Sequence, residues 1–171
     1  MLPPACHLDV EGPVVAGLLD HATVLLVENW ESFNRIHDTV LDLTPAGANP
    51  LVLWRGDHSA TRADHALGLL RALGRPVWAF VDYDPAGLLI AASLPGLAGI
   101  IAPAPGQLER DLAQGLSARY QDQLPAAAAA LDACPIAPVK TLWAILRRHG
   151  RALPQERYLL DPAATGVSHR G

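Results

Sequence analysis

Two aspartates, Asp82 and Asp84, have the spacing in this sequence that most directly indicates chemistry. They follow the apolar run at residues 76–81 and lie two positions apart, so an extended backbone would project both carboxylates from one face. Adjacent carboxylates repel unless a positive group lies between them, and Mg²⁺ is usually bound by one or two carboxylates with phosphate and water. A divalent-metal site is therefore one interpretation. The other is that Asp84 caps a helix that begins at Pro85.

A third carboxylate, Glu28, directly follows the apolar run at residues 23–27 and precedes a segment of helical periodicity. A charge in this position is tolerated at the mouth of a sheet, where ligands bind. Glu28 could instead stabilise the N-terminus of the following helix, although Asn29 and Glu31 could do the same. With Asp82 and Asp84 it forms the candidate catalytic and metal-binding set.

Candidate phosphate contacts lie in two loops of the N-terminal half. Arg55 and Gly56 could contact a phosphate, and Asp57 could add one further carboxylate to the metal, unless this is a surface loop without a ligand role. Gly87, one turn into the helix expected at Pro85, would allow a phosphate or another backbone segment to approach closely.

A basic cluster near the C-terminus includes Arg147 and Arg148 in an otherwise acidic chain. These arginines could neutralise backbone phosphates beside a metal site. Arginines in the last turn of a helix also complement its macrodipole, so both explanations stay open.

The elements that must position these residues are short apolar runs alternating with helical segments. This alternation predicts an α/β fold with a mainly parallel four-stranded sheet flanked by helices. The strands are expected at residues 23–27, 51–54, 76–81 and 99–101. Glu28, the loop at Arg55 and the pair Asp82 and Asp84 would then all lie at the carboxyl ends of strands, where open α/β sheets bind ligands.

Helices are predicted from apolar residues three or four positions apart and from capping signals. The first would carry Trp30, Phe33, His37, Val40 and Leu41 on one face, and the second would begin at a capping box formed by Thr61 and Asp64. A third would begin at Pro85, and three more would cover residues 107–120, 125–133 and 138–149. We therefore divide the chain into a lead-in at 1–20, an α/β core at 21–103 and a helical C-terminal extension at 104–171.

The composition of the chain excludes several classes of protein. The 171 residues carry a formal charge of −4, with 13 basic and 17 acidic side chains, which argues against a basic nucleic-acid coat protein but not against a metal-dependent nuclease. The two cysteines, Cys6 and Cys134, form neither a zinc motif nor a disulfide framework. No secretory signal or membrane-length apolar run is present, so we expect a cytoplasmic protein without membrane contact.

Three motifs in order carry a resemblance to a known family. They are Val-Glu-Asn-Trp-Glu-Ser-Phe at residues 27–33, Arg-Gly-Asp at 55–57 and Phe-Val-Asp-Tyr-Asp-Pro-Ala-Gly-Leu at 80–88. Over residues 20–103 the chain resembles the Toprim domain, and within it the branch of JetD, the nuclease subunit of Wadjet plasmid-defence systems, and of the type IIB topoisomerase A subunit. The pair Gln155-Glu156 also resembles the end of the JetD-type domain, although an exposed helix start is the interpretation we favour for it.

The resemblance implies a Rossmannoid fold in which Glu28, Asp82 and Asp84 hold Mg²⁺ or Mn²⁺. The implied function is a metal-dependent nuclease that hydrolyses phosphodiester bonds, most simply in DNA, within a plasmid- or phage-defence complex. The alternative is a non-catalytic metal- or phosphate-binding module in a larger DNA-processing assembly. About twenty residues precede the first strand, too few for the domain that supplies the attacking tyrosine in topoisomerase relatives, so topoisomerase activity by this chain alone is not expected.

Overall fold

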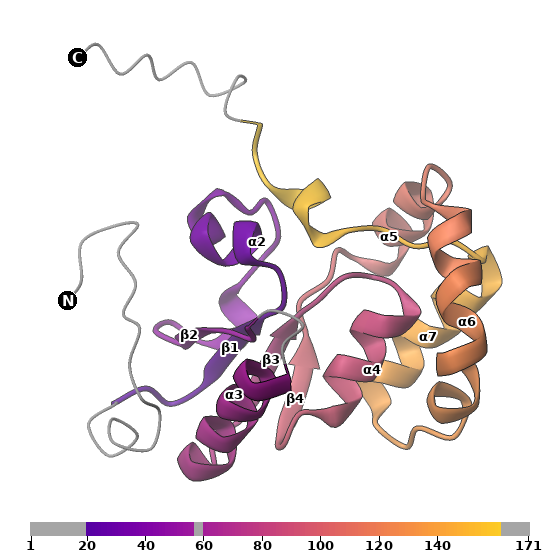
Figure 1. The fold of residues 1–171 in the computed structure, drawn as a ribbon. Coiled ribbons are helices and arrows are strands. Elements are labelled where there is room, and N and C mark those ends of the chain that lie inside the picture. Colours follow the sequence, from indigo (N-terminus) through magenta and orange to yellow (C-terminus); the bar gives the residue numbers. More distant parts are fainter. Residues whose placement is uncertain (1–19, 57–59, 162–171) are drawn as a thin grey trace.

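A central parallel sheet organises the fold (Figure 1). The computed structural model describes residues 20–56 and 60–161. In these ranges the sheet has the order β2-β1-β3-β4, and neighbouring strands are parallel. Its strands are β1 (Val24–Val27), β2 (Leu51–Trp54), β3 (Val77–Phe80) and β4 (Leu97–Ile100). The predicted α/β class with a four-stranded sheet is confirmed.

The sheet is covered on both faces because alternate residues of its strands enter different apolar clusters. Val24 and Leu26 of β1 belong to the larger cluster, while Leu25 and Val27 belong to a smaller one. Side chains of α3 (Ala60–Leu73), α4 (Pro85–Ser93) and α7 (Ala137–His149) pack in the larger cluster. The smaller cluster is closed by the segment that contains α2 (Trp30–Asn34) and the 3₁₀ turns η2 (Ile36–Asp38) and η3 (Thr44–Ala46).

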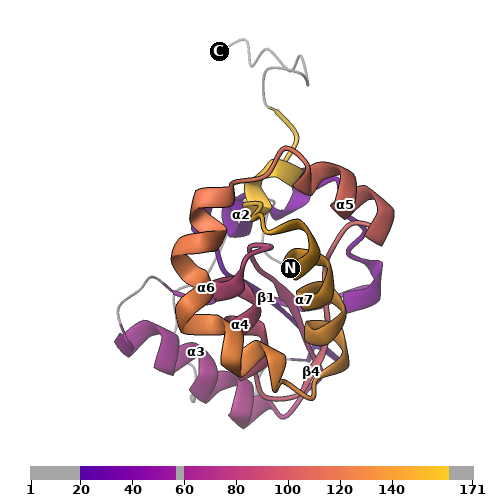
Figure 2. The same ribbon diagram turned by 90° about the vertical axis from the view of Figure 1, so that its right-hand side faces the viewer.

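The C-terminal helices α5 (Pro105–Leu112), α6 (Ser117–Asp132) and α7 share the core of the sheet domain. Leu108, Leu131 and Leu146 from these helices join the same cluster as Val24 and Leu26. Figure 2 looks onto α6 and α7, which contact each other and α4. None of the helices in the described ranges is long and apolar enough to cross a membrane.

The first predicted helix is much shorter than its apolar spacing suggested. α2 ends at Asn34, and Val40, expected on its buried face, is 60% exposed. The reason is tertiary: the Val40 N–H donates to the carbonyl of Tyr158 at 2.9 Å, and the Leu160 N–H donates to the carbonyl of Asp38 at 2.8 Å. The C-terminal segment therefore forms hydrogen bonds with backbone groups of Asp38 and Val40 that a longer helix would have bonded within itself.

Three helix boundaries also differ from the prediction. Thr61 lies inside α3 rather than before it, and Pro125 lies inside α6 rather than at a helix start, with the buried residues of α6 on both sides of it. The predicted helix at 107–120 is broken near Gly115, where an added Cβ would lie 2.7 Å from the carbonyl oxygen of Ala152. Close backbone packing, which periodicity does not report, sets this break.

Candidate functional site

The loops after β1, β2 and β3 meet at the carboxyl edge of the sheet and enclose a cleft of about 350 Å³. Glu28 follows β1, Arg55 follows β2 and Asp82 follows β3, as adjacent parallel strands require. We call this hollow the carboxylate cleft. It is lined by Glu28, Asn29, Trp30, Trp54, Arg55, Gly56, Asp82, Arg119 and Glu156.

Glu28 and Asp82 are in direct contact although 54 residues separate them. The backbone N–H of Asp82 donates to Oε2 of Glu28 at 3.0 Å. The Asp82 carboxylate accepts from the Gln155 N–H at 2.8 Å through Oδ1 and from the Arg119 guanidinium through Oδ2. The structure therefore brings together two of the three predicted carboxylates on the wall of one cleft.

Asp84, the third predicted carboxylate, does not line the cleft and is fully buried. Its Oδ1 caps α4 by accepting the Gly87 N–H at 2.7 Å, while its Oδ2 accepts from Gln123 at 3.1 Å and lies 2.7 Å from Nε of Arg119. The helix-cap interpretation of Asp84 is thus confirmed. Arg119 supplies the positive group that the two adjacent aspartates required.

Gly87 is needed for backbone packing. A Cβ at this position would overlap the carbonyl oxygen of Asp82 and lie 3.0 Å from its carbonyl carbon. The close approach expected from the sequence is therefore an approach of α4 to the backbone of Asp82. Tyr83, between the two aspartates, is buried and donates its hydroxyl to the carbonyl of Ile101 at 3.0 Å.

The C-terminal segment completes the cleft, a contribution that the sequence did not predict. Leu153 pairs with Tyr83 through two backbone hydrogen bonds of 2.9 and 3.0 Å, and Figure 1 shows this segment running from α7 towards α2. Gln155 begins η4 (Gln155–Tyr158) and is fully buried, so the expectation of an exposed helix start here is wrong. Its side-chain amide, oriented by its partners, donates to the Phe80 carbonyl at 3.0 Å and accepts the Asn29 N–H at 2.7 Å.

Burial and mutual repulsion raise the pKa values of the carboxyl groups in the cleft. The pKa of Glu28 rises to about 7, first because burial disfavours the charged form and then because Asp82 is close. Burial also raises the pKa of Asp82 and of Glu156. Glu28 can therefore gain or lose a proton near neutral pH.

Two side-chain atoms of the cleft residues are buried without a hydrogen-bond partner among the described residues. They are Oε2 of Glu156 and Nε1 of Trp54. The other carboxylate oxygen of Glu156 accepts from the side-chain amide of Asn29. Buried polar atoms without a hydrogen-bond partner are uncommon in folded proteins.

The remaining predicted site residues fall in three places. Arg55 and Gly56 line the cleft, Gly56 with φ of +95°, whereas Asp57 lies outside the described residues. Arg147 and Arg148, in the last turn of α7, do not line it and instead pair with Asp132 and Glu109. Arg119 and Gln123, four positions apart on α6, were missed because such a pair is also common on solvent-exposed helix faces.

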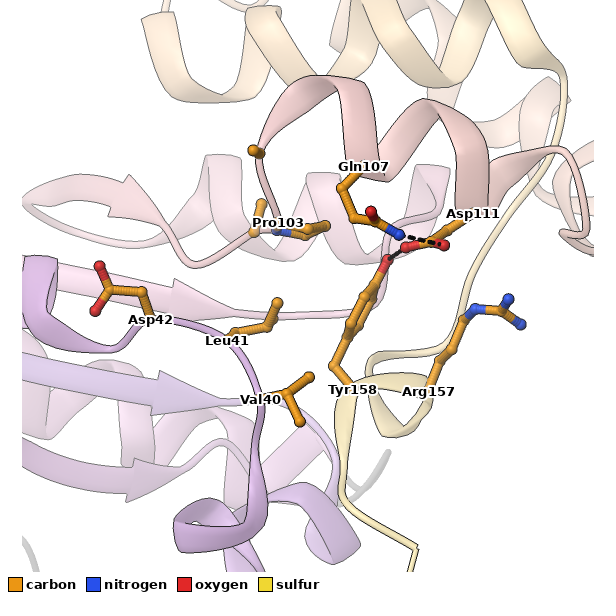
Figure 3. A pocket seen from close by; sticks show the side chains of 10 residues that line it. Val40, Leu41, Asp42, Pro103, Gln107, Asp111, Arg157 and Tyr158 are labelled. Carbon is orange, nitrogen blue, oxygen red and sulfur yellow. Dashed lines mark hydrogen bonds between the residues drawn. The ribbon is translucent and has the colours of Figure 1, made fainter.

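A second hollow, of about 520 Å³, lies between the segment after η2, the start of α5 and η4 (Figure 3). Asp111 is its polar centre: it accepts the Tyr158 hydroxyl and the Gln107 side-chain amide, both at 2.8 Å. We call it the tyrosine pocket. It is lined by Val40, Leu41, Asp42, Ala102, Pro103, Ala104, Gln107, Asp111, Arg157 and Tyr158.

The fold and cleft place the molecule among α/β proteins with a parallel sheet and acidic side chains at its carboxyl edge. The chain belongs to the family described as a domain of unknown function, DUF7281, which matches residues 1–163. No curated protein and no solved structure matches the chain.

Proposed function

We propose that the chain is a Toprim-type nuclease that hydrolyses a phosphodiester bond of DNA with a divalent cation at the carboxylate cleft. The observation that carries the proposal is the contact between Glu28 and Asp82 at the carboxyl edge of the sheet. The three Toprim-like motifs support it, because one residue from each, Glu28, Arg55 and Asp82, lines this same cleft. The resemblance to JetD further suggests a cytoplasmic subunit of a plasmid- or phage-defence complex.

The residues present fit one Mg²⁺ or Mn²⁺ ion bound partly by substrate. Within residues 20–56 and 60–161 no three His, Cys, Asp or Glu side chains are grouped to hold a metal ion. Mg²⁺ is nevertheless commonly held by one or two carboxylates with phosphate and water, which Glu28 and Asp82 would provide. When bound, the cation would activate water and stabilise the charge of the transition state. Asp84 would join them only after Arg119 and Gln123 released its Oδ2.

The protein side chains have distinct tasks in this proposal. Arg119 and Arg55 can hold the phosphate, since guanidinium groups suit phosphate geometry and both line the cleft. Glu28, with its pKa near 7, can transfer a proton to the leaving oxygen or accept one from water.

A second candidate is a nucleic-acid- or phosphate-binding module that performs no cleavage. The contacts of Arg119 with both Asp82 and Asp84 favour it, because the guanidinium already compensates these carboxylates without a metal ion. In this case the arginine would be the fixed cation of the site.

Nicking of supercoiled plasmid with Mn²⁺ or Mg²⁺ tests the proposal. Glu28→Gln should lower the cleavage rate by about a hundredfold or more, because it removes an acid–base group and a metal ligand while keeping an acceptor for the Asp82 N–H. Glu31→Gln is the matched control, since Glu31 is exposed and pairs with Arg35 outside the cleft. It should cleave like the wild type.

Circular dichroism melts confirm that both variants are folded, and calorimetry measures Mg²⁺ binding. Full cleavage by folded Glu28→Gln would refute the assigned site. A wild-type chain that binds DNA but neither binds Mg²⁺ nor cleaves, alone or with its partners, would support the second candidate.

A further inference from the structure

The rim of the carboxylate cleft on the β2 side is aromatic. Trp30, at the start of α2, and Trp54, at the end of β2, both line the cleft. Their ring centroids lie 4.8 Å apart at an interplanar angle of 66°, and Phe33 supports Trp30 from 5.5 Å. Contacts with these two rings hold the indole of Trp30 in place at the rim of the cleft.

Trp30 keeps 44% of its surface exposed. Burial of aromatic surface is strongly favourable, so the exposed part of this ring is area that a bound ligand could cover. Among the described residues the other large exposed apolar side chains are the aliphatic Val40, Leu116 and Leu160, none of which lines this cleft. The exposed aromatic surface therefore coincides with the cleft.

The order of the strands determines which charged residues lie beside the exposed surface of Trp30. Across the edge of the sheet, Trp54 and Arg55 lie at the end of β2, Glu28 follows β1 and Asp82 follows β3. Arg119 of α6 is bound to Asp82. Neighbouring strands are about 4.8 Å apart, so the aromatic rim lies only about 10 Å from Asp82. A nucleotide whose phosphate met Arg55 would have its base beside Trp30.

We propose that Trp30 stacks against an unpaired nucleobase, so that the carboxylate cleft takes single-stranded or locally unpaired DNA rather than intact duplex. The identity of the phosphate-binding part of the cleft rests on the function proposed above. Within a duplex both faces of a base are covered by its neighbours, whereas an unpaired or flipped base offers a free face to an aromatic side chain. Stacking of this kind tolerates any base sequence because every base has such a face.

Binding without catalysis tests the inference on the full chain. Fluorescence anisotropy would compare a fluorescein-labelled oligothymidylate with a blunt duplex of the same length, in EDTA and again in Mg²⁺. The wild type should bind the single strand at least about tenfold more tightly in one of these conditions. Trp30→Leu should weaken single-strand binding about tenfold, the loss expected for one base–aromatic stack, while Trp30→Phe retains most of it.

Val40→Ala is the control for loss of an exposed apolar side chain, since Val40 is 60% exposed and lines the tyrosine pocket instead. It should bind like the wild type, and circular dichroism melts establish that Trp30→Leu is folded. Equal affinity for single strand and duplex, unchanged binding by folded Trp30→Leu, or no binding in either condition would overturn the inference. Trp30-dependent binding without metal-dependent cleavage would uphold it and reject the nuclease.

Discussion

The carboxylate cleft and the tyrosine pocket differ in how their polar groups are satisfied. In the tyrosine pocket the Asp111 carboxylate accepts from Tyr158 and Gln107, and Gln107 in turn accepts from Arg110. In the carboxylate cleft, burial raises the pKa values of Glu28, Asp82 and Glu156, and Oε2 of Glu156 has no partner among the described residues. The carboxylate cleft, the smaller of the two hollows, therefore holds the carboxyl groups whose charged form is disfavoured and, among the described residues, the buried carboxylate oxygen without a partner.

The volume of a hollow therefore does not by itself identify the functional site of this protein. Apolar walls and internally paired polar groups suit a gap left between packed elements, whereas buried carboxylates held close together cost stability that a structural role would not require. The tyrosine pocket is the larger of the two, at about 520 Å³ against about 350 Å³. If chemistry is confined to the carboxylate cleft, substitutions there should affect activity and substitutions in the tyrosine pocket should not.

The largest effect on stability is expected from Gly87→Ala. The added methyl group would overlap the carbonyl oxygen of Asp82, so α4 or the Asp82 loop must move at a cost of about 3 kcal/mol. Gly68→Ala on α3 is the matched control. Apart from its own helix backbone, no atom of the described residues lies within 4 Å of its added Cβ, and this change should stabilise the fold by about 0.5–1 kcal/mol.

Urea unfolding of both glycine variants measures the difference. Equal stability of Gly87→Ala and the wild type would show that the cleft wall is not packed as described.

A smaller effect, about 2 kcal/mol, is expected from the pH dependence of Glu28. Its pKa is about 7 in the folded chain and 4.5 ordinarily, so between these pH values the folded state holds a proton that the unfolded state has released. The stabilising contribution of the protonated group is therefore present below pH 4.5 and lost as pH rises through 7. The glutamine side chain of Glu28→Gln does not ionise, so the variant keeps this contribution at high pH. It should therefore gain stability relative to the wild type between pH 5 and 8.

Unfolding free energies at the two pH values provide the measurement. Glu31→Gln should change stability by no more than about 0.5 kcal/mol at either pH, as expected for a surface substitution. An equal wild-type-to-Glu28→Gln difference at pH 5 and pH 8 would contradict the burial argument for Glu28.

The smallest effect is expected from Tyr158→Phe in the tyrosine pocket. It removes one hydrogen bond to Asp111 and should cost about 1 kcal/mol in thermal or urea unfolding. Metal-dependent cleavage and oligonucleotide binding should match the wild type. Loss of cleavage or of oligonucleotide binding in the folded variant would show that the tyrosine pocket is also part of the functional site.

Several features of the site could be predicted because local sequence determines them. Apolar runs bounded by polar residues located all four strands to within two residues, and Asp84-Pro85 correctly marked the start of α4. Parallel strands end at a common edge, so Glu28 and Asp82 could be placed together from their positions alone. The sequence also indicated that Gly87 would allow a close approach of a phosphate or of backbone, and the structure shows the backbone of Asp82 there.

Tertiary structure alone decided which groups complete the cleft. Arg119 and Gln155 contact Asp82 from 37 and 73 residues along the chain, and no local pattern encodes such contacts. The same packing of the C-terminal segment ended α2 at Asn34, because its backbone groups bond to residues 38–40. Sequence by itself determined the strands, the carboxylates at their ends and the cap that Asp84 places on α4, because these depend on neighbouring residues. Only long-range contacts decided that Arg119 and Gln123 would hold the second carboxylate oxygen of Asp84.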